Sequence, residues 1–195
     1  MKPIVRSEVL PLGEYETIRA KFRDRVVAEK RPRRVDVGEH MSVLFENRDT
    51  VLLQIQEMMR VERITRDAAI EHEVATYNDL IPADDQLSMT LFIQIGDKEK
   101  REAVLAACAG MEQRVALEVD GERYGAKAGD KDGADPKRTT AVQYYKIDLP
   151  PEVAERWRKG EVESAAIVVD HPGYQHRAEM NDATKAALGS DLAWT

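Results

Sequence analysis

The chain has 195 residues and a formal net charge of -7 at pH 7, with 43% hydrophobic and 33% charged residues. This composition excludes a disordered chain, and the negative total disfavours non-specific binding of nucleic acid by the whole molecule. The lone cysteine, Cys108, excludes an intramolecular disulfide, and the longest strongly apolar run, "AAIVV", is too short to span a membrane. We therefore expect a cytoplasmic protein with no membrane association.

Residues 1–82 are predicted to form a helical region with short strands. Apolar residues recur at helical spacing over 11–30, and apolar and polar residues alternate over 35–45, which indicates a helix followed by a short hairpin. Asn47 is a good N-cap, so a second helix is predicted over 48–63. A third follows and ends before Pro82.

Residues 83–195 are predicted to form an α+β region. Period-two alternation begins at Leu87, and the segments up to His171 read as strand, helix, strand, strand, helix, strand. This order is that of a ferredoxin-like βαββαβ antiparallel sheet. We expect the N-terminal helices and hairpin to pack on it as one compact unit. The loop over 125–140 contains "DKDGAD", which lacks the glycine and glutamate positions of a calcium loop.

Acidic residues on the helix pair raise the possibility of a metal site. Carboxylates and imidazole together suit iron, manganese or zinc. The candidate ligands are Glu57, Glu62, His72 and Glu73. However, none of the histidines follows a glutamate by three residues, as bundle di-iron sites require.

The same helix also fits a structural role, because arginines at three- and four-residue spacing can neutralise its acids. Polar side chains this close to an apolar stripe need hydrogen-bond partners. We therefore favour a structural polar network and predict no cofactor. The network comprises Glu46, Arg48, Gln54, Glu57 and Arg60.

Asp170 and His171 end a predicted strand, where they could act as an acid–base pair near neutral pH. Pro172 and Gly173 follow and indicate a turn. A histidine bonded to the backbone of that turn is the alternative that we favour.

The segment from Arg19 to Arg34 holds eight basic and two acidic residues, a local charge of +6. Phe22 is its only aromatic residue, and no nucleic-acid reader motif is present, so nucleic acid is disfavoured. We expect an acidic protein partner or self-association, with an exposed sheet face bearing Phe92 and Tyr145 as a second surface. The basic patch comprises Arg19, Arg23, Arg31, Arg33 and Arg34.

Five stretches together resemble the bacterial family known as domain of unknown function 3501. They are "LFENRDTVLLQIQEMMRVERI", "HEVATYNDLIP", "LSMTLFIQI", "AVQYYKIDLP" and "VVDHPGY". The resemblance runs from about Tyr15 to Leu192 and implies a setting beside rubrerythrin-like and iron–sulfur proteins of iron or peroxide metabolism. It implies no catalytic residues.

The expected function is that of a non-catalytic accessory or protein-binding protein of the bacterial cytosol, linked to such redox proteins. The alternative is a metal-dependent enzyme or metal-binding protein that uses the acidic residues and histidine of the helix pair.

Overall fold

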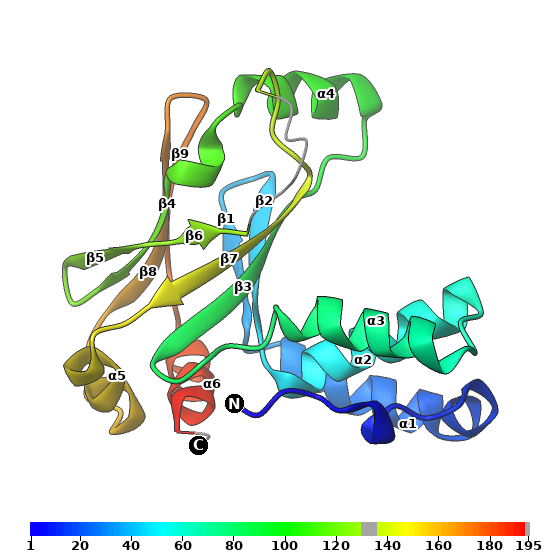
Figure 1. Ribbon diagram of the computed structural model, residues 1–195. Coiled ribbons are helices and arrows are strands. Elements are labelled where there is room, and N and C mark those ends of the chain that lie inside the picture. The colour runs from blue at the N-terminus through cyan, green and yellow to red at the C-terminus, as the bar shows by residue number, and fades with distance from the viewer. Residues whose placement is uncertain (130–135, 194–195) are drawn as a thin grey trace.

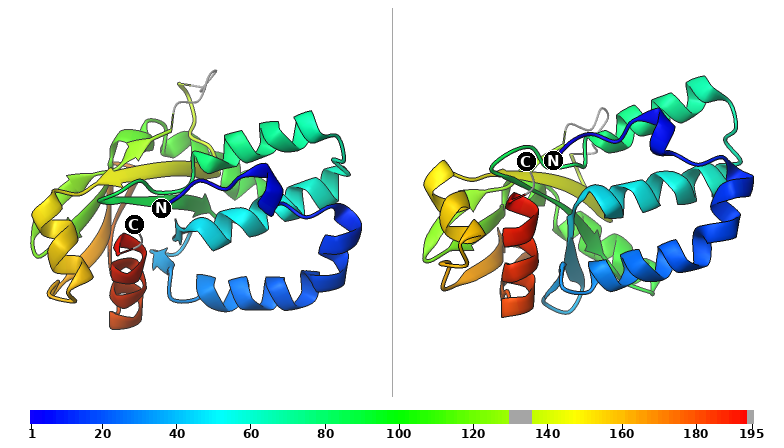
Figure 2. Two further views of the ribbon diagram at one scale, coloured as in Figure 1. Left: turned by 60° about the horizontal axis from the view of Figure 1, so that its bottom comes forward. Right: turned by 90° about the horizontal axis from the view of Figure 1, so that it is seen from below.

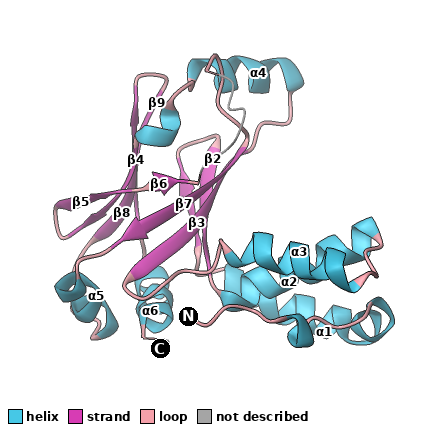
Figure 3. Ribbon diagram, in the orientation of Figure 1, coloured by secondary structure: helices cyan, strands magenta, loops and turns pink. Residues whose placement is uncertain are grey.

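The computed structural model describes residues 1–129 and 136–193 and has a mixed α+β architecture (Figure 1). The "DKDGAD" segment lies outside the described residues. Figure 3 shows the strands on one side of the molecule and the N-terminal helices grouped on the other. Within the described residues, no helix is long and apolar enough to cross a membrane.

The two sheets are antiparallel throughout. The five-stranded sheet has the order β1-β2-β3-β7-β6, and the four-stranded sheet has the order β5-β4-β8-β9. The first sheet contains β1 (Arg34–Val37), β2 (Met41–Glu46), β3 (Gln86–Ile93), β6 (Lys127–Ala128) and β7 (Val142–Asp148). The second contains β4 (Val115–Val119), β5 (Glu122–Gly125), β8 (Ala165–His171) and β9 (Tyr174–Glu179).

Alternation along the strands places the main core between these sheets. Phe45 on β2 and Leu91 on β3 are fully buried and share one hydrophobic cluster with Leu117 on β4 and Ile167 on β8. The alternate side chains of β2 and β3 therefore point away from this core and toward the N-terminal helices. The period-two pattern seen from Leu87 onward is the reason the sheet has two distinct faces.

The helices lie outside the sheets (Figure 2). Three of them form the N-terminal group: α1 (Leu12–Lys30), α2 (Arg48–Glu62) and α3 (Asp67–Asn78). The others are η1 (Arg6–Glu8), α4 (Lys98–Ala107), η2 (Met111–Gln113), α5 (Pro151–Arg158) and α6 (Asp182–Leu192). A second, smaller core joins α2 and α3 to the first ten residues through Ile4, Ile55 and Ile70. The predicted helices thus form, and Asn47 caps α2 by accepting a hydrogen bond from the Thr50 amide.

The ferredoxin-like βαββαβ sheet is not the observed topology. That arrangement would place β3, β4, β7 and β8 in a single sheet, whereas β3 pairs with β7 in one sheet and β4 pairs with β8 in the other. The turn at Asp120 and Gly121, with φ values of 48° and 88°, folds the chain back on itself and adds the hairpin of β4 and β5. Our reading counted this hairpin as one strand. After β5 the chain crosses to the five-stranded sheet, where β6 forms the edge strand beside β7.

The predicted division between residues 82 and 83 passes through the five-stranded sheet. β2, from the first region, pairs with β3, from the second, over the whole length of β2. The two regions therefore share a sheet as well as a core.

A buried ion pair connects the end of α1 to the C-terminal helix. The Arg33 guanidinium donates to both carboxylate oxygens of Asp191, at 3.0 and 2.7 Å. Glu29 adds a second acceptor at 3.1 Å, and both partners of the main pair are less than 10% exposed. Because this pair is shielded from water, losing one partner leaves an uncompensated buried charge.

We predict that Asp191→Ala lowers the free energy of unfolding by about 3 kcal/mol, since Arg33 would stay buried with only the partly exposed Glu29 as its counter-ion. Urea unfolding followed by circular dichroism measures this change. Asp182→Ala, at an exposed position of the same helix, is the matched control and should cost much less. Equal losses of unfolding free energy in the two variants would show that the buried ion pair stabilises the protein no more than an exposed one does.

Candidate functional site

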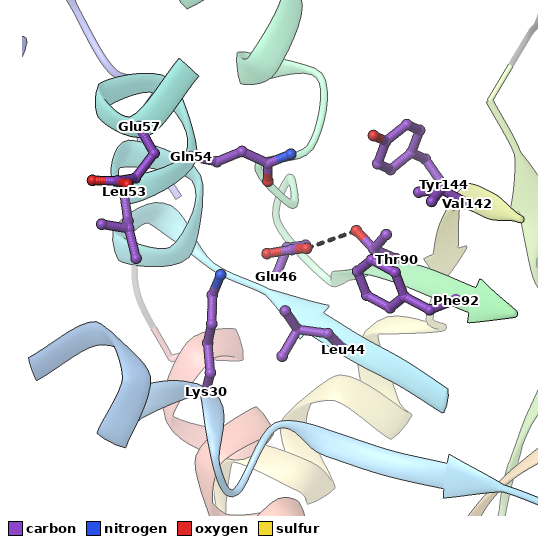
Figure 4. Close-up of a pocket in the computed structure, with 10 residues that line it drawn as sticks. All are labelled: Lys30, Leu44, Glu46, Leu53, Gln54, Glu57, Thr90, Phe92, Val142 and Tyr144. Carbon is purple, nitrogen blue, oxygen red and sulfur yellow. Dashed lines mark hydrogen bonds between the residues drawn. The ribbon is translucent and has the colours of Figure 1, made fainter. Parts of the chain in front are cut away.

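A cleft of about 410 Å³ lies between the outer face of the five-stranded sheet and the N-terminal helices (Figure 4). Strands β2, β3 and β7 form its floor, and the end of α1 and one side of α2 form its walls. The lining residues are Lys30, Leu44, Glu46, Leu53, Gln54, Glu57, Thr90, Phe92, Val142 and Tyr144.

Strand register assembles the floor from residues far apart in sequence. Leu44, Thr90 and Tyr144 form one row across the three strands, because Leu44 pairs with Thr90 and Thr90 pairs with Tyr144. Phe92 and Val142 are paired in a neighbouring row. Side chains two residues apart on a strand point to the same face, so both rows face the cleft.

Glu46 ends β2 and is the buried charged group of the cleft floor, with 3% of its surface exposed. The hydroxyl of Thr50 donates to its Oε2 at 2.5 Å, and the hydroxyl of Thr90 donates to its Oε1 at 2.6 Å. The nearby N-terminus of α2 also favours negative charge. Among the described residues, no lysine, arginine or histidine side chain forms an ion pair with this carboxylate.

Lys30 and Gln54 extend into the cleft on either side of Glu46, Lys30 from the end of α1 and Gln54 from α2 (Figure 4). Phe92 and Tyr144 lie beyond Thr90 on the sheet side. Burial raises the pKa of the Tyr144 hydroxyl, and the negative charge of Glu46 adds to this shift. Tyr144 is therefore neutral at physiological pH. The cleft combines one buried carboxylate, one ammonium group and neutral polar groups with apolar walls.

Glu57 also lines the cleft, but its carboxylate is fully engaged. Arg19 donates to both of its oxygens, at 2.8 and 2.9 Å, and the buried Tyr15 hydroxyl donates at 2.7 Å. Arg60 contributes a longer contact of 3.4 Å. The Arg19 hydrogen bonds are the main cause that lowers the pKa of Glu57 to about 2. This cluster joins α1 to α2.

The predicted metal ligands are not brought together as a set. In the part of the chain that the structure describes, no three His, Cys, Asp or Glu side chains are arranged to hold a metal ion. Glu57 is occupied by Arg19, while Glu62 and His72 are exposed on the helices. Glu73 is partly buried on α3.

The five residues of the predicted polar network divide into separate contacts. Glu57 and Arg60 belong to the cluster that joins α1 to α2, and Glu46 bonds two threonines. Arg48 donates to Glu8 and to the carbonyl oxygen of Lys2, so it fastens α2 to the N-terminal segment. Gln54 lines the cleft. Only Glu46 connects helix to sheet as expected.

Asp170 and His171 do not bond to each other. His171 Nε2 lies 3.0 Å from the carbonyl oxygen of Ala109, and its Nδ1 accepts from the Gly173 amide at 3.0 Å. Both ring nitrogens therefore form hydrogen bonds with the backbone. Asp170 instead accepts from Gln175 and pairs with Arg123.

The basic patch is only partly a free surface. Arg33 is buried against Asp191, and Arg19 is bound to Glu57. Arg34 donates to Ser42 at 2.8 Å and lies over the ring of Phe92, 5.5 Å from its centroid. Arg23 and Arg31 are exposed. The expected face with Phe92 and Tyr145 does not exist, because Tyr145 is 1% exposed within the core between the sheets.

Three polar lining residues were missed from sequence: Lys30, Thr90 and Tyr144. Thr90 and Tyr144 occupy polar-face positions of their strands, and this alternation was a usable signal. Their proximity to Lys30 depends on strand order and helix placement, which local patterns do not report.

We predict that Glu57→Gln lowers the free energy of unfolding by about 2 kcal/mol at pH 7, because the charged contacts to Arg19 are lost. The folded-state pKa lies below the ordinary value of 4.5, so this contribution is complete above about pH 4.5. It disappears as the pH falls toward 2. Urea unfolding at a series of pH values, with the exposed Glu62→Gln as control, measures the difference. A deficit that did not shrink in acid would contradict this account.

Comparison with known proteins places the chain in a family. A family model described as "Protein of unknown function (DUF3501)" matches residues 3–192. A crystal structure of a novel protein of unknown function from Burkholderia pseudomallei K96243 is similar, with 31% identity and a TM-score of 0.91. The match covers 98% of this chain and 100% of that chain. No curated protein matches. The chain belongs to the DUF3501 family of proteins of unknown function.

Proposed function

We propose that this protein is an accessory protein that binds a small organic molecule in the cleft over the five-stranded sheet. The observation that carries the proposal is Glu46, a carboxylate 3% exposed in the cleft floor, with hydroxyl donors but no ion-pair partner among the described residues. A buried charge of this kind is costly unless a counter-ion or strong donors compensate it. A bound ligand would supply that compensation.

The dimensions and lining of the cleft support the same proposal. Its volume of about 410 Å³ falls in the range of sites for small ligands. Leu44, Leu53 and Phe92 provide apolar contact, while Gln54 and Thr90 provide polar groups that can orient a bound molecule. A mostly apolar cavity with a few converging polar groups is the usual composition of a ligand site.

The proposed setting is the reducing cytosol of a bacterium, near proteins of iron or peroxide metabolism. The buried free thiol of Cys108 is compatible with a reducing compartment. The link to redox proteins rests on the family resemblance.

We predict that Val142→Trp abolishes binding in the cleft, because the indole would fill its mouth, where Val142 is 37% exposed. Amide chemical shifts of ¹⁵N-labelled protein during titration with benzylamine, benzyl alcohol and benzoate are the measurement. At least one probe should shift amides of the lining residues in the unmodified protein and none should in the variant.

Val61→Trp is the matched control, since Val61 is 63% exposed on α2 and does not line the cleft. It should bind as the unmodified protein does. If none of the probes shifted the lining amides of the unmodified protein, the proposal would fail.

A second candidate function is the docking of an acidic protein on α1. This helix is 19 residues long, yet only Tyr15 and Val26 are buried. Arg23 and Arg31 are exposed on its outer side and just after its end. An exposed cationic surface attracts an acidic partner over a distance of about a Debye length, roughly 8 Å at physiological salt. A second copy of the chain is the other candidate partner.

We predict that the double substitution Arg23→Glu and Arg31→Glu weakens binding of a fluorescein-labelled polyglutamate peptide about tenfold, because the attraction becomes repulsion. Fluorescence anisotropy at low and at physiological salt measures this. Lys98→Glu, an exposed position on α4, serves as the control. Sedimentation velocity of the same proteins tests self-association. Unchanged affinity of the double variant for the peptide would contradict the proposal that α1 binds an acidic partner.

A further inference from the structure

We infer that the ligand of the cleft is an organic cation, a protonated amine with a short apolar body, whose ammonium group binds Glu46. This inference rests on the proposed function and adds the chemical class of the ligand. It depends on the charge of the cleft floor, the unused acceptor capacity of Glu46, and the apolar groups around it.

The Glu46 carboxylate can accept more hydrogen bonds than it receives from Thr50 and Thr90. An ionised carboxylate offers about four lone-pair sites for hydrogen bonds. Thr50 and Thr90 each occupy one oxygen of Glu46. Acceptor sites therefore remain, and an ammonium group can fill them because it carries up to three N–H donors and a full positive charge.

The charges that line the cleft favour a cation near Glu46. Glu46 and Glu57 both line the cleft, but Glu57 is already neutralised by Arg19 and Arg60. Glu46 is the cleft carboxylate that forms no ion pair with any described residue. In a site shielded from water, opposite charges attract more strongly than in bulk solvent. An anionic ligand would have to place its charge beside Glu46 and would be repelled.

Apolar side chains of the cleft can contact the body of such a ligand. Leu44 and Leu53 are almost fully buried, and Val142 stands at the mouth. Together they offer apolar surface on several sides of Glu46. The Tyr144 ring lies on the sheet side of the cleft and can contact a cation through its face (Figure 4). A short aliphatic or aromatic amine matches this combination.

Lys30 acts as an internal competitor in this arrangement. Its side chain extends into the cleft from the end of α1, opposite the sheet (Figure 4). The lysine ammonium reduces the cost of the Glu46 charge when the cleft is empty, and it repels a bound cation. Removing this charge should therefore strengthen amine binding, whereas a site for anions would lose affinity.

The test compares three probes of similar shape: benzylamine, benzyl alcohol and benzoate. Their affinities are measured from amide shifts of unmodified protein, Glu46→Gln, Lys30→Met and Glu62→Gln. Protonated benzylamine should bind the unmodified protein at least tenfold more tightly than the other two. Glu46→Gln should lose at least tenfold in affinity for it, and Lys30→Met should gain about threefold. Glu62→Gln, which removes the same charge from an exposed position, should have no effect.

The outcomes separate the two proposals. If benzyl alcohol or benzoate bound in the cleft as tightly as benzylamine, the cation inference would fail while the cleft remained a ligand site. If none of the probes shifted the lining amides, both would fail. Weaker amine binding in Lys30→Met would also overturn the inference, and this variant keeps the test decisive if Glu46→Gln does not fold.

Discussion

The central constraint on this fold is that the five-stranded sheet buries side chains on both of its faces. Its inner face is apolar and packs against the second sheet through residues such as Phe45 and Leu91. Its outer face is equally buried at Ser42, Thr90 and Glu46, none of which is more than 3% exposed. Buried polar groups need partners. The outer face therefore requires side chains from α2 and nearby strands, and this requirement is what places Glu46 in the floor of a cleft.

The helices and strands were well predicted from the sequence, because they follow from hydrophobic periodicity and helix capping. The helix after Asn47 and the alternation from Leu87 both correspond to observed elements. The sheet topology was not well predicted, because it depends on which strands pair across long stretches of sequence. Asp120 and Gly121 were correctly recognised as a turn, but the segment was counted as one strand. The order of strands and helices along the chain fits a ferredoxin-like sheet, but it does not reveal that β4 pairs with β8 in a second sheet.

The candidate site was predicted less completely than the fold, for a related reason. Residues of charged helices can be paired at three- and four-residue spacing from sequence alone, and Glu57 with Arg60 is such a pair. The stronger partner of Glu57 is Arg19, 38 residues away, and Arg33 finds Asp191 across 158 residues. The run of basic residues predicted an exposed surface, but two of these residues, Arg19 and Arg33, form ion pairs within the protein.

The two carboxylates of the cleft show how environment separates groups of the same chemistry. Glu57 meets a bidentate guanidinium, which holds its charge and its geometry in place. Glu46 meets hydroxyl groups, which are neutral and leave its charge without a counter-ion among the described residues. Glu57 on the wall of the cleft therefore has a structural role, whereas Glu46 on the floor remains available to bind a ligand. Of these two carboxylates, only Glu57 forms ion pairs with described residues. The cleft therefore favours a cationic ligand, and the position of Glu46 determines where the positive charge of that ligand would bind.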